Sequence, residues 1–236
     1  MGAELNFRNW GKQGSVYDYY DHSITVSVIN RSSAESIIGS FDSDCWAGIM
    51  VNGNNKVNVV VDNITIKGYY YAFYTNGSCE GAIISVSDSK MEAGNAEEGI
   101  GVYLAGLYTY SFDDCDIKGS TGYYTKSGYH AIIDCDIEAT KTTHKAPQHN
   151  GSGANGTGSG IVVDSATGYK DPIEMQIKDC EIKSKDGYAI EEIATSADPA
   201  TAVYYSTITL GSGEDSNVYI VKEELAQTPN ALKQED

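Results

Sequence analysis

Arginine, proline and long apolar segments are scarce in this sequence of 236 residues. The only arginines are Arg8 and Arg31, so chemistry in the rest of the chain must use lysine, histidine or carboxylates. No apolar run approaches the roughly 18 residues of a membrane-spanning helix, and residues 1–12 lack the apolar core of a signal peptide. We therefore expect no membrane span, and an exported protein would have to be a trimmed or excised form.

Positive charge is scarce as well. Sixteen Lys and Arg residues stand against 33 Asp and Glu residues, which gives a net charge of −17 at pH 7. Such a chain repels the phosphate backbone of nucleic acids and anionic membrane surfaces, so we expect no nucleic-acid partner. Tyrosine and glycine are abundant, with 18 and 25 residues, and this balance favours short strands joined by polar turns over long helices.

A repeat with a period in the twenties organises the sequence. Three similar phrases, SFDDCDIKGS, AIIDCDIEAT and IKDCEIKSKD, begin at Ser111, Ala131 and Ile177. Polar and apolar residues alternate within each phrase, which is the period of a β-strand. Their alignment predicts a solenoid in which each turn of the chain stacks on the one before. The alignment gives a column of large apolar residues at Ile66, Met91, Ile117, Ile137, Ile182 and Ile208.

Within each repeat, two or three short strands follow Gly-containing turns with no helix between them. The sequence therefore predicts an all-β fold, a single-stranded parallel β-helix of about seven to eight coils, and the resemblance that follows implies that it is right-handed. It resembles the right-handed β-helix superfamily, which contains pectate lyases, polygalacturonases and many surface proteins of bacteria and phages. The resemblance covers residues 24–221 and rests on the repeat pattern rather than on a catalytic motif. We expect residues 1–23 to cap the β-helix and residues 222–236 to form a tail.

The three phrases place cysteines in one inward-facing column. Cys115, Cys135 and Cys180 should stack as small apolar side chains in the core. A zinc site would need spacings such as C-x2-C, which are absent here. A disulfide between neighbouring coils stays open as an alternative. Cys45 and Cys79 lie outside the column, and the sequence assigns them no role.

Two acidic columns flank these cysteines. The first falls at the bend between two strands, where Asp and Asn commonly cap turns by accepting bonds from nearby backbone N–H groups. The second is an outward column of like charges, with Lys118 and Lys183 two positions along to offset it. A bound Ca²⁺ is the alternative, because oxygen ligands from several coils suit that ion. The candidate calcium ligands are Asp114, Asp116, Asp134, Asp136, Asp179 and Glu181.

An insertion of about 19 residues interrupts the repeat at residues 141–159, and long loops on rigid scaffolds frequently carry function. Two histidines of this loop, His144 and His149, could bind a metal or act as acid and base, or they could simply be solvated. His130, in contrast, falls in a largely apolar column, which predicts a histidine in the core. The candidate catalytic residues are Lys118, Lys141, His144 and His149.

Tyrosines could stack on sugar rings, because each ring offers an apolar face and a polar tip. The regular coils, the acidic surface and the lack of a convergent catalytic set favour a noncatalytic module that binds a polysaccharide or surface glycan, or that spaces other domains. The resemblance implies that such a module is secreted or at the cell surface, as part of a larger bacterial protein. The candidate ligand-binding residues are Tyr70, Tyr71, Tyr74, Tyr123 and Tyr124.

Two other functions stay open at the level of sequence. One is a calcium-dependent polysaccharide lyase acting on an acidic, uronic-acid polymer, with Lys118 or Lys141 as the base and the acidic columns as calcium ligands. The NTD, GHG and RIK patterns of polygalacturonases are absent, so a hydrolase of that type is not expected. The other is a self-associating adhesin or fibre segment, since exposed coil ends invite stacking. The sequence specifies no oligomeric state.

Overall fold

The structure is a computed structural model of the chain. Strands form the regular secondary structure of the residues that it describes, and none of those residues forms an α-helix. Three sheets contain only parallel pairs, and a fourth is an antiparallel hairpin of β2 (Trp10–Gln13) and β3 (Val16–Tyr19). The predicted all-β class is confirmed. The described residues are 2–7, 10–13, 16–19, 23–51, 57–76, 80–149, 154, 156–166, 171–211, 218–220 and 232–234.

The three parallel sheets are named here in the order used below. Sheet 1 has the strand order β1 (Gly2–Phe7), β6 (Cys45–Val51), β9 (Tyr71–Thr75), β12 (Ile100–Leu104), β15 (Thr121–Thr125), β18 (Ile161–Asp164) and β21 (Ile190–Ile193). Sheet 2 has the order β4 (Ile24–Ile29), β7 (Val57–Asp62), β10 (Glu80–Ser87), β13 (Leu107–Asp113), β16 (Gly128–Ile133), β19 (Ile173–Lys178), β22 (Ser206–Leu210) and β24 (Leu232–Gln234). Sheet 3 has the order β5 (Ile37–Gly39), β8 (Thr65–Gly68), β11 (Lys90–Ala93), β14 (Asp116–Gly119), β17 (Asp136–Ala139), β20 (Cys180–Ser184) and β23 (Val218–Ile220).

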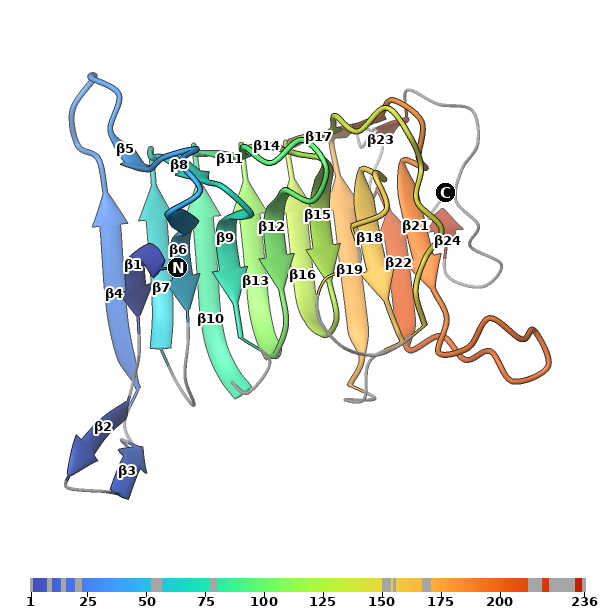
Figure 1. Cartoon of the computed structure of the whole chain (residues 1–236), viewed down its shortest axis with the longest axis horizontal. Helices are drawn as coiled ribbons and strands as arrows, with labels where there is room; N and C mark the ends of the chain where they lie inside the picture. The colour runs from blue at the N-terminus through green and yellow to red at the C-terminus, as the bar shows by residue number, and fades with distance from the viewer. Residues whose placement is uncertain are drawn as a thin grey trace.

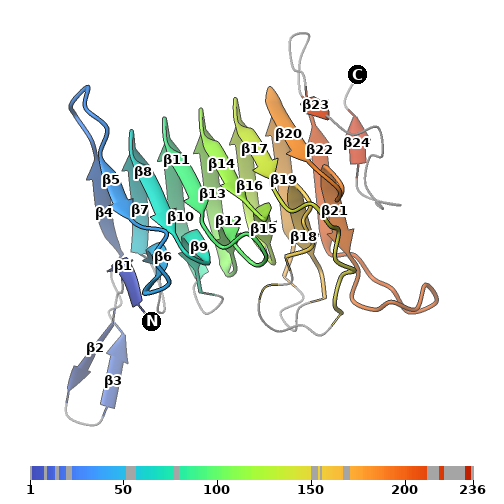
Figure 2. The same cartoon turned by 45° about the horizontal axis from the view of Figure 1, so that its top comes forward.

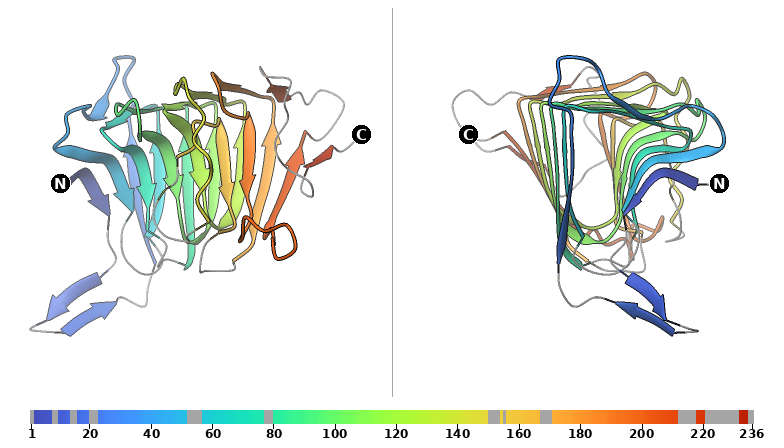
Figure 3. Two further views of the ribbon diagram at one scale, coloured as in Figure 1. Left: turned by 45° about the vertical axis from the view of Figure 1, so that its right-hand side comes forward. Right: turned by 90° about the vertical axis from the view of Figure 1, so that its left-hand side faces the viewer.

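The chain visits these sheets in a repeating order. A strand of sheet 2 leads to sheet 3, then to sheet 1 and back to sheet 2, as β13, β14, β15 and β16 illustrate. Successive turns lie side by side along the long axis of the molecule (Figures 1 and 2), and the end-on view shows the strands of each sheet overlying one another around a common interior (Figure 3). This arrangement is consistent with the predicted parallel β-helix.

Both ends of the chain contribute strands to these sheets. β1 lies within the predicted cap, residues 1–23, and pairs in parallel with β6. β24 lies within the predicted tail, residues 222–236, and pairs in parallel with β22. Most of that tail lies outside the described residues, as does Cys79.

The predicted apolar column is confirmed from β8 to β20. Ile66, Met91, Ile117, Ile137 and Ile182 occupy equivalent positions on sheet 3 and are all buried. The assignment of Ile208 to this column is wrong. Ile208 pairs with Met175 on sheet 2, and the residue opposite Ile182 is Ile220. Polar and apolar residues alternate with the same period in all three sheets. The alternating segment around Ile208 was therefore assigned to sheet 3, although it belongs to sheet 2.

The bend between sheets 2 and 3 has the same backbone conformation in five successive turns. An Asn or Asp occupies the bend each time, with φ between 47° and 55°. This left-handed conformation is costly for most L-residues, but Asn and Asp adopt it more readily than others. The recurring acidic residue at the bend therefore has a conformational explanation that requires no bound ion. The five residues are Asn63, Asp88, Asp114, Asp134 and Asp179.

The cysteine column lies in the core as predicted. Cys115, Cys135 and Cys180 are all buried and their thiols are free. The backbone N–H of Cys135 donates to Cys180 Sγ at 3.4 Å, which places two of these residues on neighbouring turns in direct contact. Cys45 is a half-buried free thiol at the start of β6.

His130 is also a core residue, as predicted. Its ring stacks on Tyr110, with 4.7 Å between ring centroids. His130 Nδ1 lies 2.7 Å from the Tyr123 hydroxyl, and Nε2 lies 3.1 Å from the Ser127 carbonyl oxygen. Because a carbonyl oxygen only accepts, Nε2 must carry the proton and Nδ1 must accept from Tyr123. Burial lowers the pKa of His130 to about 3, so the ring is neutral.

Candidate functional site

Aromatic rings form a ladder on the outer face of sheet 1. Tyr74, Tyr103 and Tyr124 occupy equivalent positions on β9, β12 and β15. The rings of Tyr74 and Tyr103 stack with centroids 5.0 Å apart, and those of Tyr103 and Tyr124 with centroids 5.4 Å apart. Trp46 and Tyr71 pack against Tyr74 at 5.0 Å and 5.1 Å. Strand alternation produces the ladder, because the residues just before them, such as Phe73 and Tyr123, point into the core.

Exposure of the ladder differs from one end to the other. Tyr124 is 0% exposed and Tyr103 is 6% exposed, whereas Tyr71 and Tyr74 are half-buried. Tyr123 faces the interior and is also 0% exposed. Neither Tyr123 nor Tyr124 presents a ring to a ligand in this structure, which corrects the prediction for these two residues.

A small pocket opens at the accessible end of the ladder. It has a volume of about 210 Å³, and its aromatic wall is made of Trp46, Tyr70 and Tyr71. Glu98 and Lys145 add one carboxylate and one ammonium group, and both residues are exposed. Burial raises the pKa of the Tyr71 hydroxyl, and the nearby Tyr74 and Glu98 add to this effect. The pocket thus combines flat apolar rings with charges of both signs. Ala154 and Gly156 complete its lining.

The insertion, residues 141–159, supplies one side of this pocket and is held at several points. Lys141 Nζ lies 2.8 Å from the Glu97 carboxylate and 2.8 Å from the Glu97 carbonyl oxygen. His149 Nδ1 lies 2.6 Å from the carbonyl oxygen of Ala194, to which it donates. Ala154 packs against the apolar cluster on the outer face of sheet 1. The described part of the insertion therefore covers that face.

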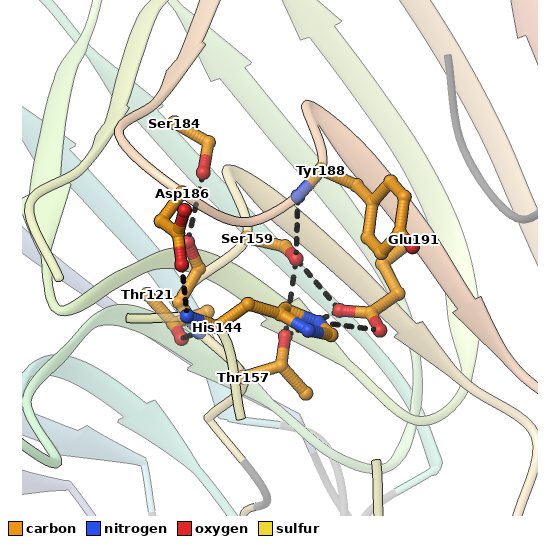
Figure 4. A network of polar contacts seen from close by, with 9 residues as sticks. Thr121, His144, Thr157, Ser159, Ser184, Asp186, Tyr188 and Glu191 are labelled. Carbon is orange, nitrogen blue, oxygen red and sulfur yellow. Dashed lines mark hydrogen bonds and ion pairs between the residues drawn. The ribbon is translucent and has the colours of Figure 1, made fainter. Parts of the chain in front are cut away.

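A buried carboxylate anchors the two ends of the insertion (Figure 4). Glu191, on β21, is 1% exposed and accepts hydrogen bonds from Thr157 at 2.5 Å and from Ser159 at 2.6 Å. Its other oxygen lies 3.0 Å from His144 Nε2. The His144 backbone N–H donates to Asp186 at 2.8 Å. Both Glu191 oxygens are thus occupied by the loop that they hold, which is the geometry of a structural anchor.

The remaining candidate catalytic residue lies elsewhere. Lys118 is on sheet 3 and forms a surface ion pair of 2.7 Å with Glu138. Lys141, His144 and His149 bind Glu97, Glu191 and Ala194, respectively. Within the described part of the chain, the four candidates therefore do not converge on one reacting group.

The outward acidic column is confirmed, but its charges are paired differently from the prediction. Asp116, Asp136 and Glu181 lie on adjacent strands of sheet 3. Lys183 binds Glu181 at 2.6 Å as expected, but Asp116 is paired with Lys90 at 2.9 Å, because Lys118 reaches Glu138 instead.

The bend column is crowded with charge but forms no metal centre. Desolvation raises the pKa of Asp88, and the neighbouring Asp114 raises it further. Lys178 lies 3.6 Å from Asp179. Among the described residues, no three His, Cys, Asp or Glu side chains are arranged to hold a metal ion. The alternative of a calcium site along these columns thus finds no support in the geometry of the described residues.

Sequence reasoning missed several residues of the pocket and of its support. Tyr103 was detectable, because aligning Gly101 of GIGVYL with Gly122 of GYYT places Tyr103 and Tyr124 in one column. The remaining residues carry no local signal, because they reach the site through loops or through pairing between distant strands. They are Trp46, Glu98, Lys145 and Glu191.

The chain matches no protein-family model, no curated protein and no solved structure. The described residues contain no helix long and apolar enough to cross a membrane. The assignment of the fold is therefore based only on the strand pairing within this chain.

Proposed function

We propose that the chain is a noncatalytic module of a secreted or cell-surface protein that binds a glycan at the pocket formed by Trp46, Tyr70 and Tyr71. In this proposal the three parallel sheets form a right-handed β-helix of the pectate-lyase-like type, with about seven to eight coils. The observation that carries the proposal is the aromatic pocket, where half-buried rings lie beside an exposed carboxylate and an exposed ammonium group.

The chemistry of the pocket suits a sugar ring. Aromatic faces pack against the apolar C–H surface of a sugar, while Glu98 can accept bonds from its hydroxyl groups and Lys145 can donate to them. A volume of about 210 Å³ is smaller than the ~300–1,000 Å³ of typical small-molecule pockets. We therefore expect the pocket to hold one sugar residue, while the rest of a polymer lies across the surface.

In this proposal the insertion holds Lys145 at the pocket and takes no part in catalysis. Lys145 projects from a loop that Glu191, Glu97 and Ala194 hold in place. A binding group on an anchored loop loses little conformational freedom when the ligand binds, which favours affinity. The same anchoring explains why the loop histidines need no catalytic role.

The test is a glycan array of neutral and acidic polysaccharides, followed by calorimetry with any glycan that binds. Replacing Trp46 or Tyr70 with alanine should weaken binding roughly 2- to 12-fold, because one aromatic contact contributes about 0.5–1.5 kcal/mol beyond buried area. Tyr129→Ala is the matched control, since Tyr129 is 42% exposed on the outer face of sheet 2. An array without hits contradicts the proposal, as does binding that depends on Tyr129 and not on Trp46.

A further inference from the structure

A lysine and an aspartate lie side by side on the outer face of sheet 1. Lys126 directly follows β15, and Asp164 is the last residue of β18, the neighbouring strand. Lys126 Nζ is 3.6 Å from Asp164 Oδ2, and the two side chains are 2% and 0% exposed. A buried ion pair is often no more stabilising than apolar side chains of similar volume, so stability alone does not explain this pair.

The surroundings hold both groups in position and exclude water. Asp164 Oδ1 accepts a hydrogen bond of 2.8 Å from the backbone N–H of Ala166, and Oδ2 accepts one from the Tyr124 hydroxyl. Burial lowers the pKa of Lys126, although the charge of Asp164 opposes this change. The uncharged amine is the nucleophilic form of lysine. The apolar cluster on this face comprises Ile100, Tyr103, Ala105, Tyr124, Val162, Ala166 and Ile193.

We propose that Lys126 and Asp164 form an intramolecular isopeptide bond, an amide that covalently joins neighbouring strands of sheet 1. The Lys126 ammonium group first passes one proton to the Asp164 carboxylate, which leaves a neutral amine and a neutral acid. The lone pair of Nζ then attacks Cγ of Asp164 and forms the C–N bond. A second proton moves from Nζ to the departing hydroxyl, with the Tyr124 hydroxyl as a relay that is regenerated, and the C–O bond breaks. The products are one amide and one water molecule, with no oxidant or cofactor consumed.

Proximity accelerates this condensation. Well-oriented intramolecular groups react at effective concentrations of roughly 10⁵–10⁸ M, because folding has already brought them together. The site is also closed to solvent, because both side chains are almost completely buried. Exclusion of water favours the condensed product and protects it once formed.

The bond also has a structural consequence. Residues 141–159 lie between Lys126 and Asp164 in the chain, so the amide closes a covalent loop around the whole insertion. The strands on either side of the insertion become fixed to each other, which holds the loop at its base. This proposal does not depend on glycan binding, and the two can fail separately.

The experiment is intact-protein mass spectrometry of the full chain under denaturing conditions. We expect a mass lower by one water molecule than the sequence requires, and a branched peptide after proteolysis that joins the segments holding Lys126 and Asp164. Lys126→Arg should have the full mass, because it keeps the positive charge but not the amine. Asp164→Ala should also have the full mass of its sequence, because it removes the carboxyl carbon that Nζ attacks. Lys141→Arg is a matched control, since Lys141 forms an ion pair with the exposed Glu97, and it should keep the water deficit.

Two outcomes overturn the proposal. The first is the full mass for the wild-type chain. The second is a water deficit that persists in Lys126→Arg, because this places the dehydration elsewhere, for example as a succinimide at Asp186 and Gly187. If Lys126→Arg does not fold, the wild-type mass and the branched peptide decide the matter.

Discussion

Replacing His130 with glutamine should remove a pH-dependent part of the stability of this protein. The neutral imidazole accepts from the Tyr123 hydroxyl and donates to the Ser127 carbonyl, and its burial lowers the pKa to about 3 from an ordinary 6.5. The unfolded chain takes up a proton on this ring below about pH 6.5, whereas the folded chain does so only near pH 3. Stability from the neutral ring is therefore fully present above pH 6.5 and is lost as the pH falls toward 3.

The magnitude follows from the width of this window. A difference of one pKa unit between folded and unfolded states corresponds to about 1.4 kcal/mol. The wild-type chain should therefore lose about 1.4 kcal/mol of unfolding free energy for each pH unit below 6.5, in addition to what its carboxylates contribute. Glutamine keeps one acceptor and one donor but does not titrate in this range. Its cost near pH 7 should be about 1 kcal/mol, the scale of one imperfect hydrogen bond.

The assay is urea unfolding of the two proteins at a series of pH values between 4 and 7. Subtracting the two unfolding free energies at each pH cancels the carboxylates that both proteins share. The difference should shrink and then change sign as the pH falls, so that the glutamine variant becomes the more stable protein in acid. His130→Met introduces the residue type found at Met175 in the next turn. Its unfolding free energy should depend on pH as weakly as that of the glutamine variant, but should be lower at pH 7. Parallel loss of stability in all three proteins would refute a neutral, buried His130.

Further predictions concern the bend, the core and the insertion. Asp134→Ala should lower the unfolding free energy by about 1–2 kcal/mol because φ is 50° at this bend, whereas Asp134→Gly should cost much less; urea midpoints of the two variants decide this. Ile137→Ala should cost about 2–5 kcal/mol in the core, while Ile83→Ala, 55% exposed, should change stability by less than about 0.5 kcal/mol. Equal costs in urea would contradict the inward assignment. Glu191→Gln should leave a hydroxyl or imidazole donor without its acceptor, at a cost of about 1–3 kcal/mol, and should speed proteolysis within residues 141–159; unchanged cleavage would count against the anchor.

Much of the fold could be predicted from the sequence because its signal is local. The alternation of polar and apolar residues around Ile117 and Ile137 indicates which side chains face the core. Its recurrence along the chain indicates which residues stack on one another in successive turns. The prediction failed at Ile208, where the alternating segment belongs to sheet 2. Alternation shows that a segment is a strand with one buried side, but hydrogen bonding to the strand of Met175 decides which sheet it joins.

Less of the candidate site could be predicted. The acidic bend residues were predicted as turn caps, but the sequence alone left open whether they also hold an ion. Their left-handed φ values explain the recurring Asn and Asp without one. Tyr123 and Tyr124 were predicted as ligand-binding residues, and the structure buries both of them on opposite sides of sheet 1.

The sequence by itself determined the all-β class, the stacked turns and the inward cysteine and histidine side chains, because each follows from a period that is read within a few residues. Only the tertiary structure decided which end of the tyrosine ladder is open. That outcome depends on the insertion folding back over sheet 1, where His144 reaches Glu191, 47 residues away in the chain. A contact between residues so far apart leaves no periodic trace in the sequence.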